Sequence, residues 1–551
     1  MGPTDGGWKA GGGGGLCALG KGASGEDTFV SVLNVKALEK ATQVNRSELF
    51  RFGTALLFIV VIMLLTMLRG EGGSDSVLLV IATMIGAYMA INIGANDVTN
   101  NVGPAVGSKA ITLAGAIIIA AIFEASGALI AGGDVVRTIK SNIIDPDLIR
   151  DADTFIWLMI GALLGAALWL NLATAIGAPV STTHSIVGGV LGAGIAAGGW
   201  HIADWNVVMR IAASWVISPV FGGVIAGGFL YVFKRTVTYK PGVLAAARVV
   251  VPRLVALMAW AFVTYLMLKG VKQIVHVNFV VAALIGLGAA IAVFFITKPY
   301  VGRACARLPD NKEGANELFT IPLIFAAALL SFAHGANDVA NAVGPLAGIY
   351  DAIVSGGIRE KASIPIWVML VGALGIALGL ALYGPKLIRM VGTEITEIDK
   401  TRAFCIALAA AITVIIASQL GLPVSSTHIA VGGVFGVGFL REYIKANYGR
   451  MIEEIKLHHA NDSPDEVEAF LNRFEAASLH ERGDMLRDLK SQKTPGVIDK
   501  DERKQLRNVH RLELVKRSLL LRIVAAWVIT VPATALLGAA LFYMVRGIML
   551  P

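Results

Sequence analysis

Apolar runs of about 20 residues recur along nearly the whole chain, and they decide what it can fold into. They lie near 51–68, 77–99, 110–132, 154–176, 178–198, 208–233, 250–268, 277–297, 319–347, 364–384, 402–420, 424–441 and 519–546. A helix of this length crosses a hydrocarbon core of roughly 30 Å and satisfies its own backbone hydrogen bonds. The sequence therefore predicts an all-α polytopic membrane protein with about 12–13 transmembrane segments, some of them broken or re-entrant.

The distribution of charge supports this class and excludes another. Only 16% of the 551 residues are charged, against roughly a quarter in soluble domains. The basic residues behind the net charge of +8 lie in loops, without a stripe of interleaved aromatic residues, so they do not indicate a nucleic-acid partner. These loop charges fit one topology, with the N-terminus in the cytoplasm and the C-terminus outside. We therefore expect a multi-pass protein of the plasma or inner membrane, embedded in the lipid bilayer.

The apolar runs also suggest how the chain is divided. The expected parts are a partly disordered cytoplasmic tail (1–50), an extra N-terminal transmembrane helix and loop (51–76), a first transmembrane repeat (77–233), linking helices (234–318), a second repeat (319–441), a charged cytoplasmic insert (442–518) and the last transmembrane helix of the second repeat (519–551). In the insert, Val467, Phe470, Leu471 and Phe474 are spaced as on a helix. We interpret it as a structural or regulatory element and leave its role, and that of the extra first helix, open.

Two strings of residues occur twice in the chain. GANDVTN at 94–100 is echoed by GANDVAN at 335–341, and PVSTTH at 179–184 is echoed by PVSSTH at 423–428. The numbering offsets are nearly equal, 335 − 94 = 241 and 423 − 179 = 244. Long strings in the same order at a nearly constant offset indicate an internal duplication.

The number of apolar runs between the copies predicts how the two halves are oriented. The second GANDV string lies seven runs after the first, and the number stays odd if 178–198 and its neighbour form a re-entrant pair. An odd number of crossings places the two copies in opposite directions through the membrane. This inverted-topology repeat is the architecture of many secondary transporters, whose sites lie near the bilayer midplane between the repeats.

Ionisable and amide side chains lie inside the repeated apolar runs. Such groups are costly in a membrane and usually functional, and the neighbouring Gly and Pro residues are expected to break the helices there. Carboxylate and amide oxygens are suitable ligands for a hard cation such as sodium, and the carboxylates can instead carry protons. The candidate sodium or proton sites are Asn96, Asp97, Asn100, Asn337, Asp338 and Asn341.

The hydroxyl-rich strings favour an anion as the second ligand. Ser and Thr hydroxyls can donate to an oxyanion, and a proline beside a helix N-terminus forms an anion-receptive position. A carboxylate repels an oxyanion unless the anion carries a proton or a cation lies between them. Phosphate still holds a proton near neutral pH whereas sulfate does not, so phosphate fits better.

The strings also resemble the signature of the inorganic phosphate transporter (PiT) family, which carries Gly-Ala-Asn-Asp-Val-Ala-Asn once in each half. The first copy departs at Thr99, where Ala is usual. The resemblance covers about residues 77–440 and 519–546 and implies cation-coupled phosphate uptake, with sodium in some members and protons in others. It implies that phosphate and its cation are surrounded by Asn96, Asp97, Ser181, Thr182, Thr183, Asn337, Asp338, Ser425, Ser426 and Thr427.

Other roles for nearby residues are weighed against binding. Membrane Ser and Thr side chains often bond to carbonyls of their own helix, so the hydroxyl strings have a structural alternative. We expect His184 and His428 to be structural, although either can carry a proton if coupling is to protons, and Glu124, inside an apolar run, is a weaker candidate of the same kind. We expect the other polar and aromatic neighbours to pack or shape the site: His334, Trp215 and Trp527.

Three other functions remain open from the sequence. Some relatives in the same family carry sulfate, so a permease for sulfate or another oxyanion is the first. An intramembrane hydrolase using Ser181 or Ser425 is the second, although the strand-turn-helix elbow of a serine nucleophile is missing. A non-transporting receptor built on the insert is the third. We predict a transporter rather than an enzyme, with no cofactor beyond the coupling cation, and leave a homo-oligomer open.

Overall fold

The protein is described here by a computed structural model that covers residues 35–69, 74–149, 151–175, 180–270, 277–355, 364–391, 398–458 and 517–550. The chain divides into two compact units, Met1–Thr54 and Ala55–Pro551. In the first unit the described residues belong to the start of helix α2 (Val35–Met67), and the second unit holds the other described elements. The expected cytoplasmic tail up to residue 34, and most of the expected insert (459–516), lie outside the described residues.

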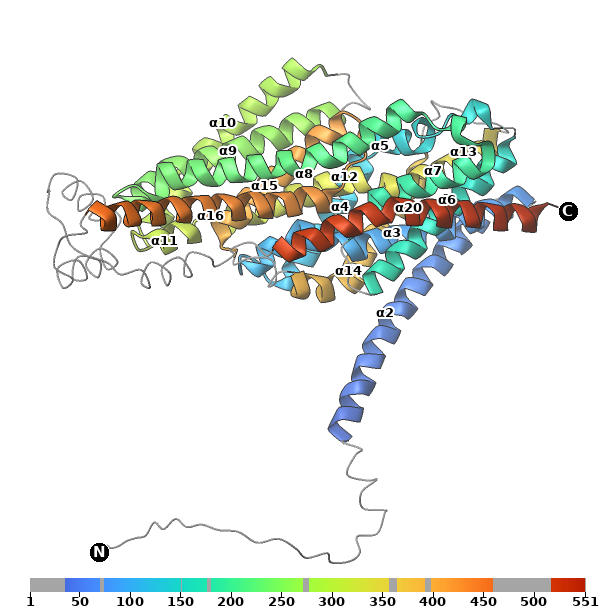
Figure 1. Cartoon of the computed structure of the whole chain (residues 1–551), viewed down its shortest axis with the longest axis horizontal. Helices are drawn as coiled ribbons and strands as arrows, with labels where there is room; N and C mark the ends of the chain where they lie inside the picture. The colour runs from blue at the N-terminus through green and yellow to red at the C-terminus, as the bar shows by residue number, and fades with distance from the viewer. Residues whose placement is uncertain are drawn as a thin grey trace, which may run out of the picture. The chain divides into compact units, whose positions relative to one another are not determined.

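The described chain is helical, apart from one isolated antiparallel bridge between Ile144 and Ala203 (Figure 1). The first half contains α3 (Ser74–Gly107), α4 (Leu113–Ala131), α5 (Gly133–Arg137), the π-helix η1 (Thr138–Asn142), the 3₁₀ turn η2 (Pro146–Leu148), α6 (Ala152–Ala175), α7 (Thr182–Gly198), the 3₁₀ turn η3 (Trp200–Ile202), α8 (Trp205–Phe233) and the π-helix η4 (Lys234–Thr238).

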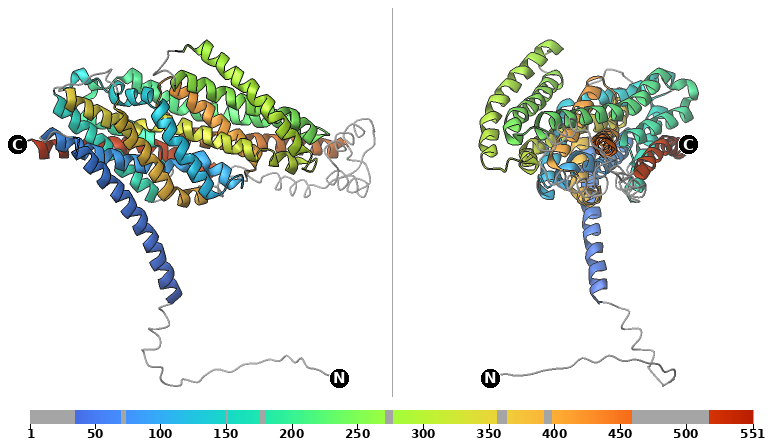
Figure 2. Two further views of the ribbon diagram at one scale, coloured as in Figure 1. Left: turned by 180° about the vertical axis from the view of Figure 1, so that it is seen from behind. Right: turned by 60° about the vertical axis from the view of Figure 1, so that its left-hand side comes forward.

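The linking helices α9 (Val243–Lys269) and α10 (Phe279–Cys305) run side by side (Figure 2). The second half contains α11 (Lys312–Glu317), α12 (Thr320–Asp338), α13 (Ala340–Ser355), α14 (Ile366–Val391), α15 (Lys400–Gln419), α16 (Ser426–His458) and α20 (Arg517–Met549).

Eleven stretches of the described chain are long and apolar enough to cross a membrane. Each coincides with one of the thirteen expected runs. The two other runs, 178–198 and 424–441, correspond to α7 and the start of α16, which follow the PVSTTH and PVSSTH prolines. Helix α7 has only 17 residues, about 26 Å at 1.5 Å per residue.

Both of these helices begin inside the protein rather than at its surface. Ser181 caps α7 and Ser425 caps α16, each through a 3.2 Å hydrogen bond that its hydroxyl oxygen accepts from the backbone N–H three residues later. Such a cap contributes about 1 kcal/mol to a helix. The two serines are buried, so the positive ends of two helix dipoles point into the core of the molecule.

The two GANDV strings differ in their backbone. The second copy is interrupted at Val339, between α12 and α13, as the sequence predicts. The first copy is not, because α3 continues as one helix through Pro104 to Gly107. Proline removes one hydrogen bond to the preceding turn, and since α3 ends three residues after Pro104, the loss falls where the helix is ending anyway. The expectation of a broken helix is therefore wrong for the first copy.

Contacts between the two halves are reciprocal. Helix α3 packs along α14, whereas α4 packs along α12. A Cβ atom on Gly127 would lie 1.9 Å from the carbonyl oxygen of Phe332, and one on Gly379 would lie 2.0 Å from that of Ile91. The offsets are 379 − 127 = 252 and 332 − 91 = 241, so the same close contact forms twice with the halves exchanged.

The other end of the repeat shows the same exchange, because α7 packs along α20 and α16 packs along α8. Here Gly188 approaches the carbonyl oxygen of Val531, and Gly432 approaches that of Pro219. The helices come this close only because glycine has no side chain. The duplicated sequence has therefore folded into two halves related by an approximate two-fold exchange.

Candidate functional site between the two halves

The four repeated strings meet in the middle of the second unit. The first half supplies them from α3 and the N-terminus of α7, and the second half supplies them from α12, α13 and the N-terminus of α16. Nearly all of their polar side chains are buried, while Asn96 and Asn100 are partly buried. The residues predicted from the sequence are thus brought to one place, although they come from positions up to 331 residues apart (427 − 96 = 331).

Asp97 accepts hydrogen bonds from both halves of the molecule. Thr182 donates to its Oδ2 at 2.9 Å, and Thr427 donates to its Oδ1 at 2.9 Å. Asn96 donates from Nδ2 to Oδ1 at 3.0 Å and also to the carbonyl oxygen of Val180 at 2.8 Å. Both carboxylate oxygens of Asp97 are therefore held by donors, and these come from both halves of the molecule.

Asp338 has fewer donors. Ser426, the counterpart of Thr182 in the second half, donates to Oδ2 at 3.1 Å. The other oxygen, Oδ1, is buried and accepts no hydrogen bond from the described residues. An unsatisfied buried carboxylate oxygen is expensive, so this atom is the strongest indication in the site of a ligand that supplies positive charge or a donor.

Asn100 and Asn341, which flank the two aspartates, each donate to hydroxyl groups of the opposite half. Asn100 donates to the hydroxyl of Thr427 at 2.7 Å, and Asn341 donates to that of Thr183 at 3.3 Å and of Thr182 at 3.2 Å. Each asparagine therefore reaches across to the hydroxyl string of the opposite half. The side-chain oxygen of Asn341 has no hydrogen-bond donor among the described residues.

Asn337 shows the same pattern as Asn341. Its Nδ2 donates to the hydroxyl of Ser418 at 3.1 Å and to the carbonyl oxygen of Leu422 at 3.2 Å. Its Oδ1 is buried and has no donor within the described residues. Oxygens of Asn337, Asp338 and Asn341 are thus left with unused acceptor capacity, which is the chemistry that a hard cation needs.

The remaining hydroxyls of the predicted set have structural partners. Ser181 and Ser425 act as the helix caps described above, and Thr183 donates to the carbonyl oxygen of Val424 at 3.0 Å. A capping oxygen is an acceptor, so the hydroxyl hydrogens of both serines are still able to donate. Thr99, which replaces the usual alanine, is buried with its hydroxyl unpartnered among the described residues.

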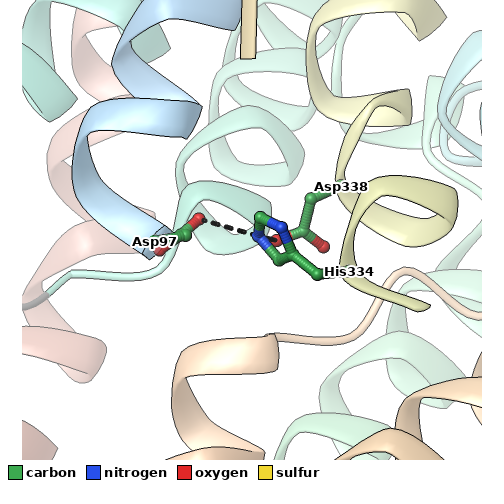
Figure 3. A group of neighbouring side chains, drawn as sticks. All are labelled: Asp97, His334 and Asp338. Carbon is green, nitrogen blue, oxygen red and sulfur yellow. Dashed lines mark ion pairs between the residues drawn. The ribbon is translucent and has the colours of Figure 1, made fainter. Parts of the chain in front are cut away.

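His334 links the two aspartates. Its Nε2 lies 2.9 Å from Oδ2 of Asp338 and 3.7 Å from Oδ2 of Asp97. Figure 3 shows the three side chains pointing toward one another, and their potential ligand atoms all lie within 4.8 Å. The contacts have ion-pair distances without hydrogen-bond geometry. The sequence predicted only that His334 shapes the site, and the structure places it at the centre.

A third acid lies on the other side of the imidazole ring. Oε1 of Glu124, in α4, is 3.2 Å from Nδ1 of His334 and accepts a 2.6 Å hydrogen bond from Asn101. Glu124 stands out in the sequence because it is an acid inside an apolar run. The hydrogen bond from Asn101 was not predicted from the sequence. Three carboxyl groups around one histidine leave the site with an excess of negative charge whenever they are ionised, which favours bound cations or protons.

His184 and His428 lie apart from this cluster. Their rings contact Trp215 and Trp527, with centroids 3.7 and 3.5 Å apart, and each other at 4.5 Å. They also border an apolar cavity of about 950 Å³ between α8, α16 and α20. Its lining of small and aromatic side chains does not suit an oxyanion.

Comparison with known proteins agrees with this geometry. A model of the Phosphate transporter family matches residues 93–538. A candidate phosphate permease of Helicobacter pylori is 51% identical over 523 residues, covering 93% of this chain and 98% of the relative. Another from Pyrococcus furiosus is 39% identical over 382 residues, covering 69% of this chain and 91% of the relative.

A solved structure is similar as well. It is described as the sodium-dependent phosphate transporter, is 30% identical, and superposes with a TM-score of 0.70 over 86% of this chain and all of its own. Sequence and structure point in the same direction over most of the chain. The protein therefore belongs to the phosphate transporter family, whose members are membrane permeases and not enzymes.

Proposed function

We propose that this protein imports inorganic phosphate by symport with sodium or protons, through alternating access of a site between its two halves. The observation that carries the proposal is the pairing of Asp97 and Asp338, one from each half, around His334 and beneath the two hydroxyl strings. Any ligand held there contacts both halves at once. Rocking of one half against the other can then expose it to either side of the membrane.

Protonated phosphate suits the chemistry of these side chains. Its oxygens accept from the hydroxyls of Thr182, Ser426 and Thr427, while its own proton is donated to a carboxylate. Sulfate has no proton to donate near neutral pH and faces two aspartates and a glutamate. The comparisons support the same substrate, since the relatives are described as phosphate permeases and the solved structure as a phosphate transporter.

A cation suits the acceptor oxygens that the protein leaves without donors. Oxygens of Asn337, Asp338 and Asn341 are available in the second half, and Asn96, Asp97 and Asn100 are their counterparts in the first. Amide and carboxylate oxygens fit sodium, and the carboxylates with His334 also fit proton coupling. Sodium is supported by the description of the similar solved structure.

Alternating access in this form requires the halves to be inverted across the membrane, and the odd number of apolar runs between the copies supports that inversion. We place the protein in the cell membrane with its N-terminus in the cytoplasm, on the charge of the loops. In this arrangement the two-fold exchange of helix partners relates the outward-facing and the inward-facing sides of the site.

Uptake by reconstituted protein tests the proposal. Labelled phosphate is added to the buffer outside the proteoliposomes. A sodium gradient, a proton gradient, or neither is imposed across their membrane. Uptake should require one gradient, should be inhibited by excess unlabelled phosphate, and should resist the same concentration of sulfate. Equal uptake with and without both gradients would refute symport, and stronger inhibition by sulfate would make the protein a sulfate permease.

A further inference from the structure

A second polar cavity lies well away from the aspartates, where α8 ends and α15 begins. It has a volume of about 170 Å³ and is lined by the end of α8 with η4, by α11 and by the first residues of α15. At roughly 30 Å³ per water, this space equals about five waters, or one tetrahedral oxyanion with part of its hydration shell. The transport proposed above does not use this cavity.

The charge around this cavity is mostly positive. Lys234, Lys312 and Arg402 line it, and Arg441 on α16 is close enough to act electrostatically on Lys234. The acid in the lining is Asp399. Three basic side chains from η4, α11 and α15 therefore line one small space, and Arg441 adds to the positive potential around Lys234.

The nearby acid is already engaged by its own helix. Asp399 caps α15 by accepting from the backbone N–H of Arg402 at 2.8 Å, and its second oxygen lies 3.3 Å from Nε of Arg402. The ammonium groups of Lys234 and Lys312, by contrast, form no hydrogen bond or ion pair with any other residue that the structure describes. Both groups remain available for a ligand.

Two polar groups beside the cavity fix its shape. The side-chain oxygen of Asn316 accepts from the backbone N–H of Thr401 at 3.0 Å and from its hydroxyl at 3.2 Å, which ties α11 to the N-terminus of α15. The positive end of the α15 dipole faces the same space. The cavity is thus built by hydrogen bonds between elements rather than left by loose packing.

We propose that this basic pocket is a second anion site, which binds a phosphate group. The separation from the transport site supports a distinct role: Arg402 and Ser418, whose hydroxyl accepts from Asn337, are 16 residues apart on α15 (418 − 402 = 16), or about 24 Å. The pocket lies at the ends of the candidate spans Trp205–Thr238 and Lys400–Gln419, the level of lipid headgroups. The phosphate group therefore comes either from free inorganic phosphate or from an anionic lipid.

The test removes the two available lysines together, as Lys234→Gln with Lys312→Gln. The matched control removes the same charge from two exposed residues that do not line the pocket, as Lys240→Gln with Arg307→Gln. Both pairs are made in the full-length protein carrying Asp338→Asn, which weakens the transport site, and are reconstituted in nanodiscs. Since the two proteins have the same net charge, a difference between them reports on the pocket.

One arm measures equilibrium binding of labelled inorganic phosphate in phosphatidylcholine nanodiscs. The other uses native mass spectrometry to count phosphatidate retained from nanodiscs that contain it. Loss of charge-assisted hydrogen bonds should weaken binding roughly tenfold or more in the pocket variant relative to its control. The effect appears in the first arm if the source is free phosphate and in the second if it is lipid.

Equal behaviour of the pocket variant and the control in both arms would overturn the proposal. If the double variant does not fold, the single change Lys312→Gln replaces it, because Lys312 is exposed and its side chain contributes no described hydrogen bond. This single variant should weaken binding less than the double variant does. If it binds as strongly as its control in both arms, the proposal is overturned in the same way.

Discussion

At the scale of single residues, Asp97 and Asp338 are held by different numbers of donors and should respond differently to neutralisation. Asp97 accepts from Thr182, Thr427 and Asn96, so Asp97→Asn places an amide NH₂ against donors and should lower stability by about 2 kcal/mol. Asp338 accepts one hydroxyl, so Asp338→Asn should fold nearly normally. Both should reduce phosphate uptake by roughly 10- to 100-fold.

The measurements are initial uptake rates in proteoliposomes and thermal unfolding in detergent. Asp147→Asn, at an exposed position outside the cluster, is the control and should leave both unchanged. Normal uptake by Asp97→Asn and Asp338→Asn would show that neither carboxylate belongs to the transport site.

Glu124 contacts the ring of His334, so its substitution should alter how transport depends on pH. In Glu124→Gln the new amide oxygen can still accept from Asn101, but the negative charge beside Nδ1 of His334 is gone. We expect the protein to fold, uptake to fall by roughly tenfold, and the dependence of uptake on pH to change, because a charge that contacts the His334 ring is removed from the site. An unchanged pH profile in uptake assays between pH 5.5 and 8.5 would assign Glu124 a structural role only.

The sequence predicted some residues of the site and missed the arrangement of others. Asp97, Asp338 and their asparagines were predicted because they recur in both halves and are charged or polar inside apolar runs. The position of His334 was not, because it depends on the packing of α4 against α12. The contact between Glu124 and His334 joins residues 210 positions apart (334 − 124 = 210), and no pattern along the chain encodes it.

At the scale of helices, the close approach of α4 to α12 and of α3 to α14 should be intolerant of a single methyl group. Gly127→Ala and Gly379→Ala each place a Cβ about 2 Å from a carbonyl oxygen of the facing helix, which should cost roughly 1–3 kcal/mol. Gly228→Ala in α8 meets nothing within 4 Å and should be neutral or stabilising by about 0.5–1 kcal/mol.

Melting temperatures of the three purified variants in one detergent check this expectation. Similar effects at Gly127 and Gly379 would also support the equivalence of the two contacts. Unchanged stability of both variants would mean that the helices are farther apart than the structure has them.

The helices themselves were mostly predictable, since length and apolarity set a membrane span. The exceptions were α7 and the start of α16, which are apolar enough to resemble spans but begin at serine caps buried inside the protein. Burial of a helix start depends on neighbouring helices. The runs at 178–198 and 424–441 therefore showed the composition of these segments without showing that their helices begin inside the protein.

At the scale of the whole molecule, the proposed alternating access depends on the two halves being inverted relative to each other across the membrane. The reciprocal packing of helices needs only a two-fold exchange, and the direction of each half through the membrane comes from the loop charges. The loop after α4 is rich in acids, whereas basic residues flank the segment after α14, at Lys386 and Arg389 in the end of α14 and at Lys400 and Arg402 in the start of α15, so equivalent loops should face opposite sides. Single cysteines at Asp147 and Glu397 test this in a protein whose Cys17, Cys305 and Cys405 have been replaced by alanine.

In intact cells, a membrane-impermeant maleimide should label Asp147→Cys, whereas Glu397→Cys should be labelled only after the membrane is permeabilised. Each variant must first show phosphate uptake, so that labelling reports on a functional fold. Labelling of both cysteines from the same side would make the repeat parallel rather than inverted. The two aspartates would then still meet around His334, but a parallel pair of halves has no symmetry that interchanges the two sides of the membrane, so the exchange of helix partners would no longer relate the outward-facing to the inward-facing side of the site.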